Sequence, residues 1–327
     1  MKDDMYQVRK ADMSFKESPD IDLVDADGIS IFMFGDDAAY KQRPESTKHY
    51  SLAQHIVNTK AQKYQESNSW RKRLWSNPVG SIVVRAMEYY WENLAEEDFS
   101  IVDVGSQYGV FSLVLAKYIK TSGHVNKIYA FDCGNAGKLT DRNIKLNQLD
   151  NIIKFEYKAV SNVSAPHLVY YDSEHSEDNH IVRRAFVNLP SYIVEGITLD
   201  DYFKNNNTST RNLMIKIDTQ GVEPLIFEGM KTILVGIDPP PVIIFEFVPW
   251  VCKSIKDPLQ FLNSLPEQYT LFDLNPATYD KNGKNMLRHV NKTDFDTFVI
   301  EITKKDSQST DLLLVHEKII DIASKLE

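Results

Sequence analysis

The sequence predicts an α/β fold with a mainly parallel β-sheet and helices on both of its faces. Two observations carry this prediction. Between residues 100 and 250, short apolar runs alternate with segments of helical periodicity, which is the order of successive βαβ units. The first of these units, Ser100 to Asp132, has a glycine turn after its first strand and an acid at the end of its second. Ligands bind outside the carboxyl ends of the strands in such sheets.

Within the first unit, the spacing of apolar residues changes from that of a strand to that of a helix. Ser100–Val104 is a short apolar run that ends at a glycine, as a buried parallel strand would. The segment from Val110 to Tyr118 then places its apolar residues on one helical face. Gly105 and Gly109 bracket the turn between strand and helix. Glycine is expected where the backbone bends sharply or lies against a ligand.

The turn indicates a nucleoside ligand that has no pyrophosphate. Its pattern is D-x-G-x-x-x-G rather than the dinucleotide fingerprint G-x-G-x-x-G. Asp132 follows the second strand, Lys127–Phe131, where an acid can accept hydrogen bonds from ribose hydroxyls. S-adenosylmethionine fits this pattern, because its carboxylate can meet the amides of the turn. An ordinary α/β unit with a tight turn is the alternative.

The composition and charge of the chain argue against several classes of protein. The chain has 327 residues, 43% of them hydrophobic and 25% charged, as in a soluble globular protein. Its net charge of −9 argues against a nucleic-acid partner, which favours a basic face. The two cysteines suggest no disulfide framework, and no metal-binding spacing appears. We find no signal-peptide pattern or membrane-spanning run, and expect a cytoplasmic protein without a membrane partner.

We expect two regions, an N-terminal segment at 1–97 and a Rossmann-like domain at 98–327. The first 27 or so residues are polar and predicted to be loosely held. Gly28–Phe34 is a candidate strand or hairpin, and helices are predicted from Thr47 to Glu66 and from Val79 to Leu94. This segment is expected to pack on the main domain. The alternative is that it covers the cofactor and forms part of the acceptor pocket.

Further elements follow the first unit. Helices are predicted at Lys138–Gln148, at Thr198–Phe203 with Thr198 as N-cap, and from Gly221 to Met230. Strands are predicted at Lys154–Val160, His167–Tyr171, Asn212–Asp218, Val242–Phe247, Tyr269–Leu274, Phe295–Ile302 and Asp311–His316. Residues 172–188 are predicted to form a polar loop. This order places Gly105–Gly109, Asp132, Asp218 and Glu246 on one rim of the sheet.

The order of motifs resembles the S-adenosylmethionine-dependent methyltransferases of the FkbM family. The motifs are V-D-V-G-S-Q-Y-G-V-F-S at 102–112, A-F-D at 130–132, N-I-K-L-N at 143–147, K-A-V-S at 158–161, T-L-D-D-Y-F at 198–203 and I-K-I-D-T-Q-G-V-E at 215–223. The resemblance implies a Rossmann-like class I methyltransferase fold, with a mainly parallel seven-stranded sheet. It does not cover residues 1–97, which we expect to be mostly helical. It also implies methylation of hydroxyl groups on sugars, polyketides or other secondary metabolites, without a metal.

Three positions depart from the family pattern. The family usually has G-A-N in the glycine turn, where this chain has Gly105-Ser106-Gln107. The acid of the second strand is often Glu followed by Pro, and here it is Asp132-Cys133. The family motif D-x-E-G is replaced by one with Gln220 in place of the glutamate. We therefore assign no catalytic role to Gln220.

The resemblance and the strand ends together suggest the site residues. Asp218 and Glu246 are candidates for a general base or for orienting the acceptor. Glu223 is a third candidate, although a carboxylate in the first turn of a helix is favourable in any case. The expected S-adenosylmethionine contacts are Asp103, Gly105, Ser106, Gln107, Tyr108, Gly109, Asp132, Cys133, Ala159, Val160 and Asp218.

Two other functions remain open at this point. One is a nucleotide-dependent enzyme on a similar sheet, against which the missing G-x-G-x-x-G counts. The other is a catalytically degenerate binding module, suggested by Gln220 and the altered glycine turn. The expected partner is a small-molecule or glycan acceptor, and the oligomeric state is open, a homodimer included.

Overall fold

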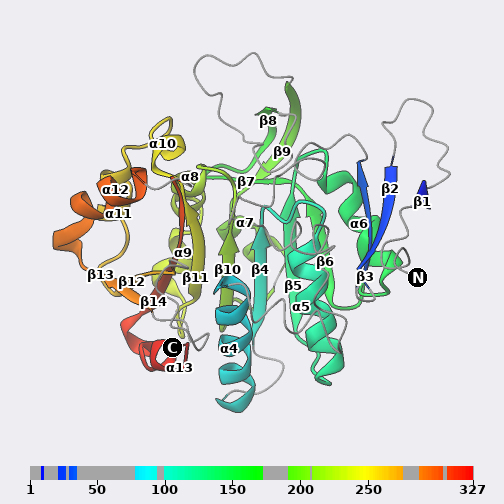
Figure 1. The fold of residues 1–327 in the computed structure, drawn as a ribbon, viewed down its shortest axis with the longest axis horizontal. Helices are drawn as coiled ribbons and strands as arrows, with labels where there is room; N and C mark the ends of the chain where they lie inside the picture. The colour runs from blue at the N-terminus through cyan, green and yellow to red at the C-terminus, as the bar shows by residue number, and fades with distance from the viewer. Residues whose placement is uncertain are drawn as a thin grey trace, which may run out of the picture.

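A computed structural model describes residues 9–10, 21–26, 29–34, 78–93, 99–171, 191–206, 208–274, 287–304 and 308–326. Figure 1 shows its elements, and their labels are used from here on. The predicted helix from Thr47 to Glu66 and the polar loop at 172–188 lie outside the described residues.

The centre of the fold is an eight-stranded sheet in the order β13-β12-β14-β11-β10-β4-β5-β6. Its strands are β4 (Ser100–Val104), β5 (Lys127–Asp132), β6 (Ile153–Tyr157), β10 (Leu213–Ile217), β11 (Val242–Phe247), β12 (Tyr269–Asp273), β13 (Arg288–Val290) and β14 (Thr310–His316). The five strands from β11 to β6 are parallel, whereas β14 pairs antiparallel with both β11 and β12. The prediction of seven strands was short by β13, a three-residue edge strand too brief to show a period of its own.

The direction in which the chain builds the sheet reverses between β4 and β10. From β4 it first adds β5 and β6 on one side, and it later adds β10 and β11 on the other. Their carboxyl ends lie at the top of Figure 1, near α8 (Glu223–Glu228). A switch point of this kind leaves a crevice at the strand ends, which is where α/β sheets bind ligands.

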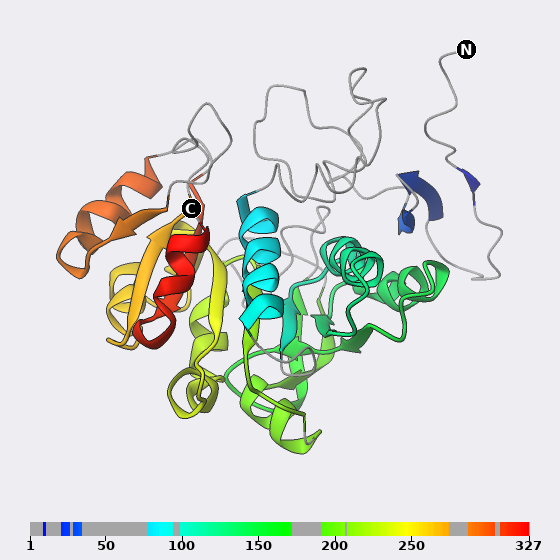
Figure 2. The same cartoon turned by 90° about the horizontal axis from the view of Figure 1, so that it is seen from below.

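Helices cover both faces of the sheet, as predicted. One face carries α4 (Pro78–Asn93), α5 (Val110–Thr121), α6 (Gly137–Leu146) and α13 (Asp321–Leu326). The other carries α7 (Leu199–Asn205), α8, α9 (Lys231–Gly236), α11 (Pro258–Asn263) and α12 (Phe295–Thr303), with the four-residue α10 (Pro249–Cys252) beside them. Figure 2 shows α4 and α13 on one side of the sheet and α7 and α9 on the other.

Alternation along the strands produces the two cores. In β11, Ile244 packs toward the α4 side, whereas Ile243 and Phe245 pack toward the α8 side. Successive strand residues point to opposite faces, so a strand buried on both sides is apolar throughout. A charged residue within these central strands is therefore buried, and it needs an oppositely charged or hydrogen-bonding partner.

The described residues of the N-terminal region form a small sheet and one helix. A three-stranded antiparallel sheet contains β1 (Arg9–Lys10), β2 (Ile21–Ala26) and β3 (Ile29–Phe34). Gly28–Phe34, predicted as a strand or small hairpin, contains the single strand β3, which pairs with β2. The loosely held start extends less far than expected because β2 pairs along its whole length with β3. The helix predicted at Val79–Leu94 is α4, and its buried side chains belong to the same core as α5.

Three segments differ from their predictions. Phe295–Ile302 is helix α12 rather than a strand, because Phe295, Phe298 and Ile302 recur at helical spacing and are its buried residues. The strand predicted at Lys154–Val160 breaks at Lys158 into β6 and the short β7 (Ala159–Val160). β7 pairs with β9 (Ser191–Ile197), which the sequence analysis missed, and β9 pairs with β8 (Ala165–Tyr171).

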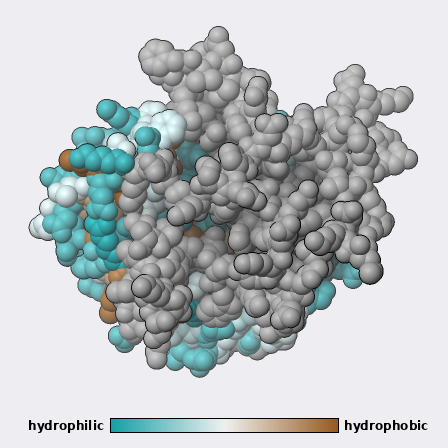
Figure 3. Space-filling model, in the orientation of Figure 1, coloured by the Kyte–Doolittle hydropathy of each residue, from teal (hydrophilic) through white to brown (hydrophobic). Residues whose placement is uncertain are grey.

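The described surface visible in Figure 3 is mainly hydrophilic, with a few separate apolar areas. Large apolar side chains that are exposed, such as Val235 and Ile193, are scattered over several elements. Within the described ranges, the helices are too short or too polar to cross a membrane.

Candidate active site at the carboxyl ends of the central strands

The glycine turn joins the two halves of the sheet. Gly105 has a φ of +81°, and a Cβ atom placed on it would lie 1.9 Å from the carbonyl oxygen of Asp218. The amide of Asp218 in turn donates to the carbonyl of Val104 at 2.9 Å. Only glycine fits a backbone with this φ and this close a neighbour. The end of β4 and the end of β10 are therefore in direct backbone contact.

The amides of this turn bind mainly within the protein. The N–H groups of Gly105 and Ser106 both donate to the carbonyl of Phe131, at 2.9 and 3.0 Å. Gly109 N donates to Ser106 O at 2.7 Å and begins α5 with a φ of +80°. The hydroxyl of Ser106, however, is buried and has no hydrogen-bond partner among the described residues. A buried donor without a partner is costly, so this hydroxyl is a group that a ligand would satisfy.

Helix α6 holds the turn from outside. Thr140 Oγ1 donates to the carbonyl of Gln107, and Asn143 Nδ2 donates to the carbonyl of Tyr108 at 3.0 Å. Tyr108 itself is fully buried. Gln107 has a φ of +53°, a conformation that costs energy for any residue with a Cβ atom. These two bonds to α6 explain how the turn keeps that conformation without the glycine that many nucleotide folds have there.

Asp132 lies at the end of β5 and faces the turn. Its Oδ2 accepts from Gln107 N at 2.8 Å and its Oδ1 from Gly134 N at 2.7 Å. Burial raises the pKa of this carboxyl to about 6, against the two backbone hydrogen bonds that lower it. A Cβ atom on Gly137 would lie 2.7 Å from Oδ1. A carboxylate oxygen accepts more than one hydrogen bond, so both oxygens keep capacity for a diol.

Three of the predicted cofactor contacts, Cys133, Ala159 and Val160, lie just after β5 or in β7. Cys133 and Ala159 belong to one small apolar cluster with Tyr170 of β8. Val160 is buried instead in the larger core that includes Phe131. Burial raises the pKa of the Cys133 thiol well above its usual range, which keeps it neutral at this position.

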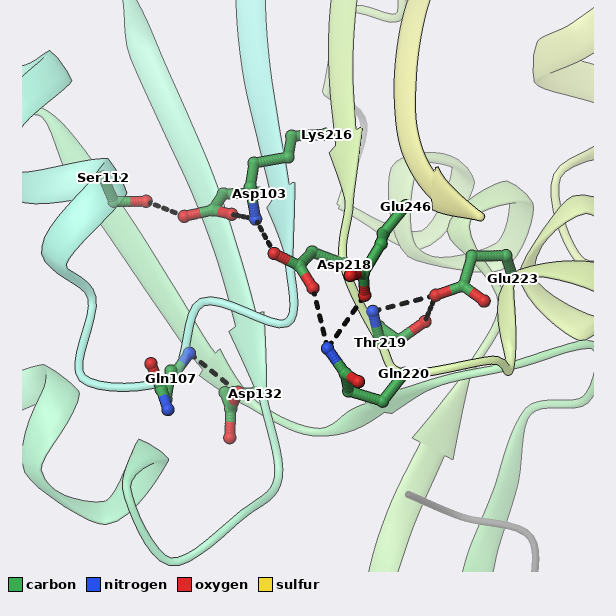
Figure 4. A network of polar contacts seen from close by, with 10 residues as sticks. All are labelled: Asp103, Gln107, Ser112, Asp132, Lys216, Asp218, Thr219, Gln220, Glu223 and Glu246. Carbon is green, nitrogen blue, oxygen red and sulfur yellow. Dashed lines mark hydrogen bonds and ion pairs between the residues drawn. The ribbon is translucent and has the colours of Figure 1, made fainter. Parts of the chain in front are cut away.

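A line of polar contacts crosses the switch point (Figure 4). It runs from Ser112 through Asp103, Lys216, Asp218 and Gln220 to Glu246.

The first half of this line is a buried ion pair. Lys216 Nζ lies 3.5 Å from Asp103 Oδ1 and 3.3 Å from Asp218 Oδ2. Asp103 and Lys216 are directly opposite each other in the pairing of β4 with β10. Ser112 Oγ also donates to Asp103 at 2.7 Å. Burial alone disfavours the ammonium, but Asp218 and Asp103 outweigh it and raise the pKa of Lys216.

The second half gathers the acids predicted as catalytic. Glu246 Oε2 accepts from Gln220 Nε2 at 2.8 Å, and Asp218 Oδ1 lies 3.4 Å from the same nitrogen. Burial, followed by Asp218 and Asp311, raises the pKa of Glu246 well above its usual range. Asp311 lies opposite Glu246 in the pairing of β11 with β14. Burial and Asp218 raise the pKa of Asp311 to about 7.

Glu223 has a different environment from the other acids. It is 2% exposed, and its Oε1 accepts from both the amide and the hydroxyl of Thr219, at 3.0 and 2.9 Å. Burial raises its pKa to about 7 despite these hydrogen bonds. Its carboxyl closes the turn between β10 and α8, which is the role of a residue that holds a turn together.

Sequence reasoning did not single out Lys216 or Asp311, and it assigned no catalytic role to Gln220, whose side chain contacts Asp218 and Glu246 in the structure. A signal existed for Lys216, since a lysine inside the apolar strand I-K-I-D requires a buried partner. Asp311 carried no such signal, because its position opposite Glu246 follows from an antiparallel pairing of distant strands. No group of three or more metal-binding side chains occurs among the residues that the structure describes.

The solved structures that this chain resembles include three proteins of low identity. They are an rRNA methylase from Streptococcus thermophilus (13% identity, TM-score 0.36, covering 73% of this chain and 96% of that one), the CMeT domain of the citrinin polyketide synthase (12%, 0.31, 76% and 60%), and a candidate methyl transferase from Burkholderia thailandensis bound to S-adenosyl-homocysteine (8%, 0.27, 75% and 76%). These TM-scores are too low to support an argument from structural likeness. A comparison with curated proteins gave no match.

The sequence-family comparison is the informative one. The family model described as the methyltransferase FkbM domain matches residues 103–265. That span begins at Asp103 and includes the glycine turn, Asp132 and the line of contacts as far as Glu246. The resemblance predicted from the motifs is thereby confirmed: the chain carries a methyltransferase domain of the FkbM family at residues 103–265.

Proposed function

We propose that this methyltransferase uses S-adenosylmethionine and transfers the methyl group to a hydroxyl of a small molecule or glycan. One observation supports the proposal above the others. The ribose-binding acid Asp132 and the glycine turn lie on one side of the switch point, and Asp218 with Glu246 lies on the other (Figure 4). The close contact of Gly105 with the backbone of Asp218 joins the two sides.

The residues present suit S-adenosylmethionine. Asp132 would accept from the ribose hydroxyls, and the buried Ser106 hydroxyl would serve the amino-acid end of the cofactor. Cys133, Ala159 and Val160 would line the base. The cofactor supplies a methyl group that is already activated on a sulfonium. Positioning of the two reactants can therefore provide much of the rate, up to about 7–11 kcal/mol for ideal orientation.

Asp218 is the best placed group to take the proton from a hydroxyl acceptor. Its side chain is 41% exposed, whereas its partner Lys216 is 13% exposed. In the transfer, the acceptor oxygen would gain the methyl group as the methyl–sulfur bond breaks. The hydroxyl proton would pass to the carboxylate of Asp218, while Lys216 remains protonated and fixes the other carboxylate oxygen. A well-placed base contributes roughly 10²–10⁴-fold in rate. Glu246 is a second acceptor-side carboxyl, and Glu223 holds the turn.

Isothermal titration of the purified protein with S-adenosylmethionine, S-adenosylhomocysteine and NAD tests the cofactor. We expect micromolar binding of the first two and a loss of at least about tenfold in affinity in Asp132→Ala, as expected for lost hydrogen bonds to a charged group. Asp141→Ala, on the exposed surface of α6, is the matched control and should bind normally. The affinity should also fall as the pH drops through about 6, where Asp132 takes up a proton.

Other outcomes would change the assignment. Absence of binding by both sulfur compounds would favour a degenerate binding module, and preference for NAD would favour a nucleotide-dependent enzyme. Once the cofactor binds, formation of S-adenosylhomocysteine with a panel of sugar, phenol, alcohol and amine acceptors identifies the acceptor class. Turnover with amines alone would overturn the assignment of O-methylation.

A further inference from the structure

Gln220 occupies an unusual place between two carboxyl groups. It lies in the turn after β10 with a φ of +58°, followed by Gly221 with a φ of +97°. This turn brings its side chain back across the strand ends, between Asp218 and Glu246 (Figure 4). Its Nε2 is 2.8 Å from Glu246 Oε2 and 3.4 Å from Asp218 Oδ1. A left-handed residue with a long side chain is kept here by those contacts rather than by backbone preference.

An amide at this position can do what a carboxylate cannot. The Nε2 group carries two donor hydrogens and no charge, so it can donate to both acids at once. Since both neighbours are acceptors, the network itself decides that nitrogen rather than oxygen faces them. A glutamate, which is usual in this motif, would instead add a third negative charge within hydrogen-bonding distance of the first two.

The charges around Glu246 make a neutral donor valuable. Asp218, after β10, faces it, as do Asp311 of β14 and Glu223 of α8, and Lys216 is the cation that acts on it. Hydrogen bonds to the ionised form stabilise it, whereas nearby negative charges destabilise it. Gln220 therefore offsets part of the repulsion between Glu246 and Asp218 without introducing a charge.

We propose that Gln220 is a positioning residue that favours the ionised form of Glu246 and holds the side chains of Asp218 and Glu246 in place through its amide. The inference rests on the proposed function for its catalytic consequence. The ionisation of Glu246 is a property of the chain itself, and it can be measured without an acceptor.

The test is an NMR titration of the full chain with isotope-labelled glutamate carboxyl groups. Glu246→Gln identifies the Glu246 resonance by its disappearance. In Gln220→Asn the shorter amide cannot reach Glu246, so the midpoint of the Glu246 titration should rise by about one pH unit, the size expected for loss of one charge-assisted hydrogen bond. Gln220→Glu, which keeps the shape, should raise that midpoint further.

Matched controls come from Gln148, which is exposed and has a φ of +55°. Gln148→Asn and Gln148→Glu make the same chemical changes in the same backbone conformation and should leave the Glu246 midpoint unchanged. An unchanged midpoint in both Gln220 variants would overturn the proposal. If Gln220→Asn does not fold, the isosteric Gln220→Glu decides alone.

Titration with S-adenosylmethionine separates this proposal from the proposed function. Because Gln220 lies on the acceptor side, both variants should bind the cofactor within about twofold of the unmodified chain. A chain that binds no cofactor but shows the shifted midpoint would refute the function and support the role of Gln220 in the pair. If the variants bind the cofactor and the Glu246 midpoint does not shift, the cofactor assignment would be supported and the role of Gln220 refuted.

Discussion

One cation, Lys216, interacts with several of the carboxyl groups around β10 and β11. Lys216 contacts Asp103 below it and Asp218 beside it, and it also lowers the pKa of Glu246 and Asp311. Burial of an ion pair is costly unless its geometry and further hydrogen bonds are good. Here Ser112 and Gln220 provide those hydrogen bonds at the two ends.

Glu223 allows a direct test of a purely structural carboxyl. Its pKa is raised to about 7 in the folded protein, so the folded state binds its proton more tightly than the unfolded state. The stability that this proton contributes is full below about pH 4.5 and is lost as the pH rises through 7. In Glu223→Gln the remaining oxygen can still accept from Thr219. We expect this variant to be more stable than the unmodified chain at pH 8, by about 1–3 kcal/mol, and nearly equal at pH 5.

Urea unfolding at the two pH values measures this difference. Glu267→Gln, at a side chain that is 91% exposed, provides the control and should change stability little at either pH. Lower stability of Glu223→Gln at pH 8 would show that the charged form is needed, and would return Glu223 to the catalytic candidates.

Asp218→Asn tests the proposed base. The amide cannot accept a proton from the acceptor, although it preserves the shape of the side chain and the backbone contact with Gly105. We expect turnover with an identified hydroxyl acceptor to fall by roughly 10²–10⁴-fold, while titration shows cofactor affinity largely kept. Full activity would remove Asp218 from the catalytic residues and leave Glu246 as the candidate.

Among the elements, the glycine turn is the most demanding in its geometry. Gly105→Ala would place a methyl group 1.9 Å from the carbonyl oxygen of Asp218 at a φ of +81°. Gly123→Ala is a close control, since Gly123 has a φ of +80° and no atom within 4 Å of the added methyl. Gly123→Ala should lose only the stability that backbone strain costs, about 1 kcal/mol. Gly105→Ala must also displace the end of a strand.

We therefore expect Gly105→Ala to lower the free energy of unfolding by at least about 3 kcal/mol and to abolish cofactor binding. Gly123→Ala should bind the cofactor normally. Equal effects of the two substitutions in urea unfolding would mean that the close contact at Gly105 relaxes without cost.

The elements also show where prediction from sequence reaches its limit. The βαβ units between Ser100 and Phe247 were predicted well because buried strands and amphipathic helices differ in period. The run from Phe295 to Ile302 was misassigned, since a short apolar segment fits either period and its burial on α12 depends on the neighbouring α11. Thr198 was predicted correctly as a cap, and its hydroxyl accepts from Asp201 N at 3.0 Å.

The site itself was predicted only in outline. Strand-end rules placed Asp132, Asp218 and Glu246 on one rim. They could not show that Asp103 points inward to Lys216, because that follows from the register of β4 against β10. The contact between Gln220 and Glu246 depends on a left-handed turn that no local pattern announces.

The whole molecule joins distant parts of the chain in one core. Helix α4 comes before the first strand of the central sheet and α13 comes near the end of the chain, yet the two pack together with α5. Met87 of α4 and Ile322 of α13 are both fully buried there. The N-terminal segment, which was predicted to pack on the main domain, thus contributes a helix to its core.

Ile322→Ala tests this connection. Removal of a buried isoleucine leaves a cavity and should cost about 2–5 kcal/mol. Ile320→Ala, at a neighbouring side chain that is 37% exposed, should cost less than 1 kcal/mol. Hydrogen exchange should show loss of protection in α4 as well as in α13 for the first variant. Unchanged protection in α4 would mean that the two helices unfold independently.

The contact between Gly105 and the backbone of Asp218 has a consequence for protein engineering. Because the two strand ends meet without room for a methyl group, neither can be exchanged for a segment of a different shape unless the other changes with it. Chimeras between relatives should therefore transplant the turn after β4 and the turn after β10 as one block. Libraries aimed at new acceptors should leave this junction untouched and vary the loops that surround it.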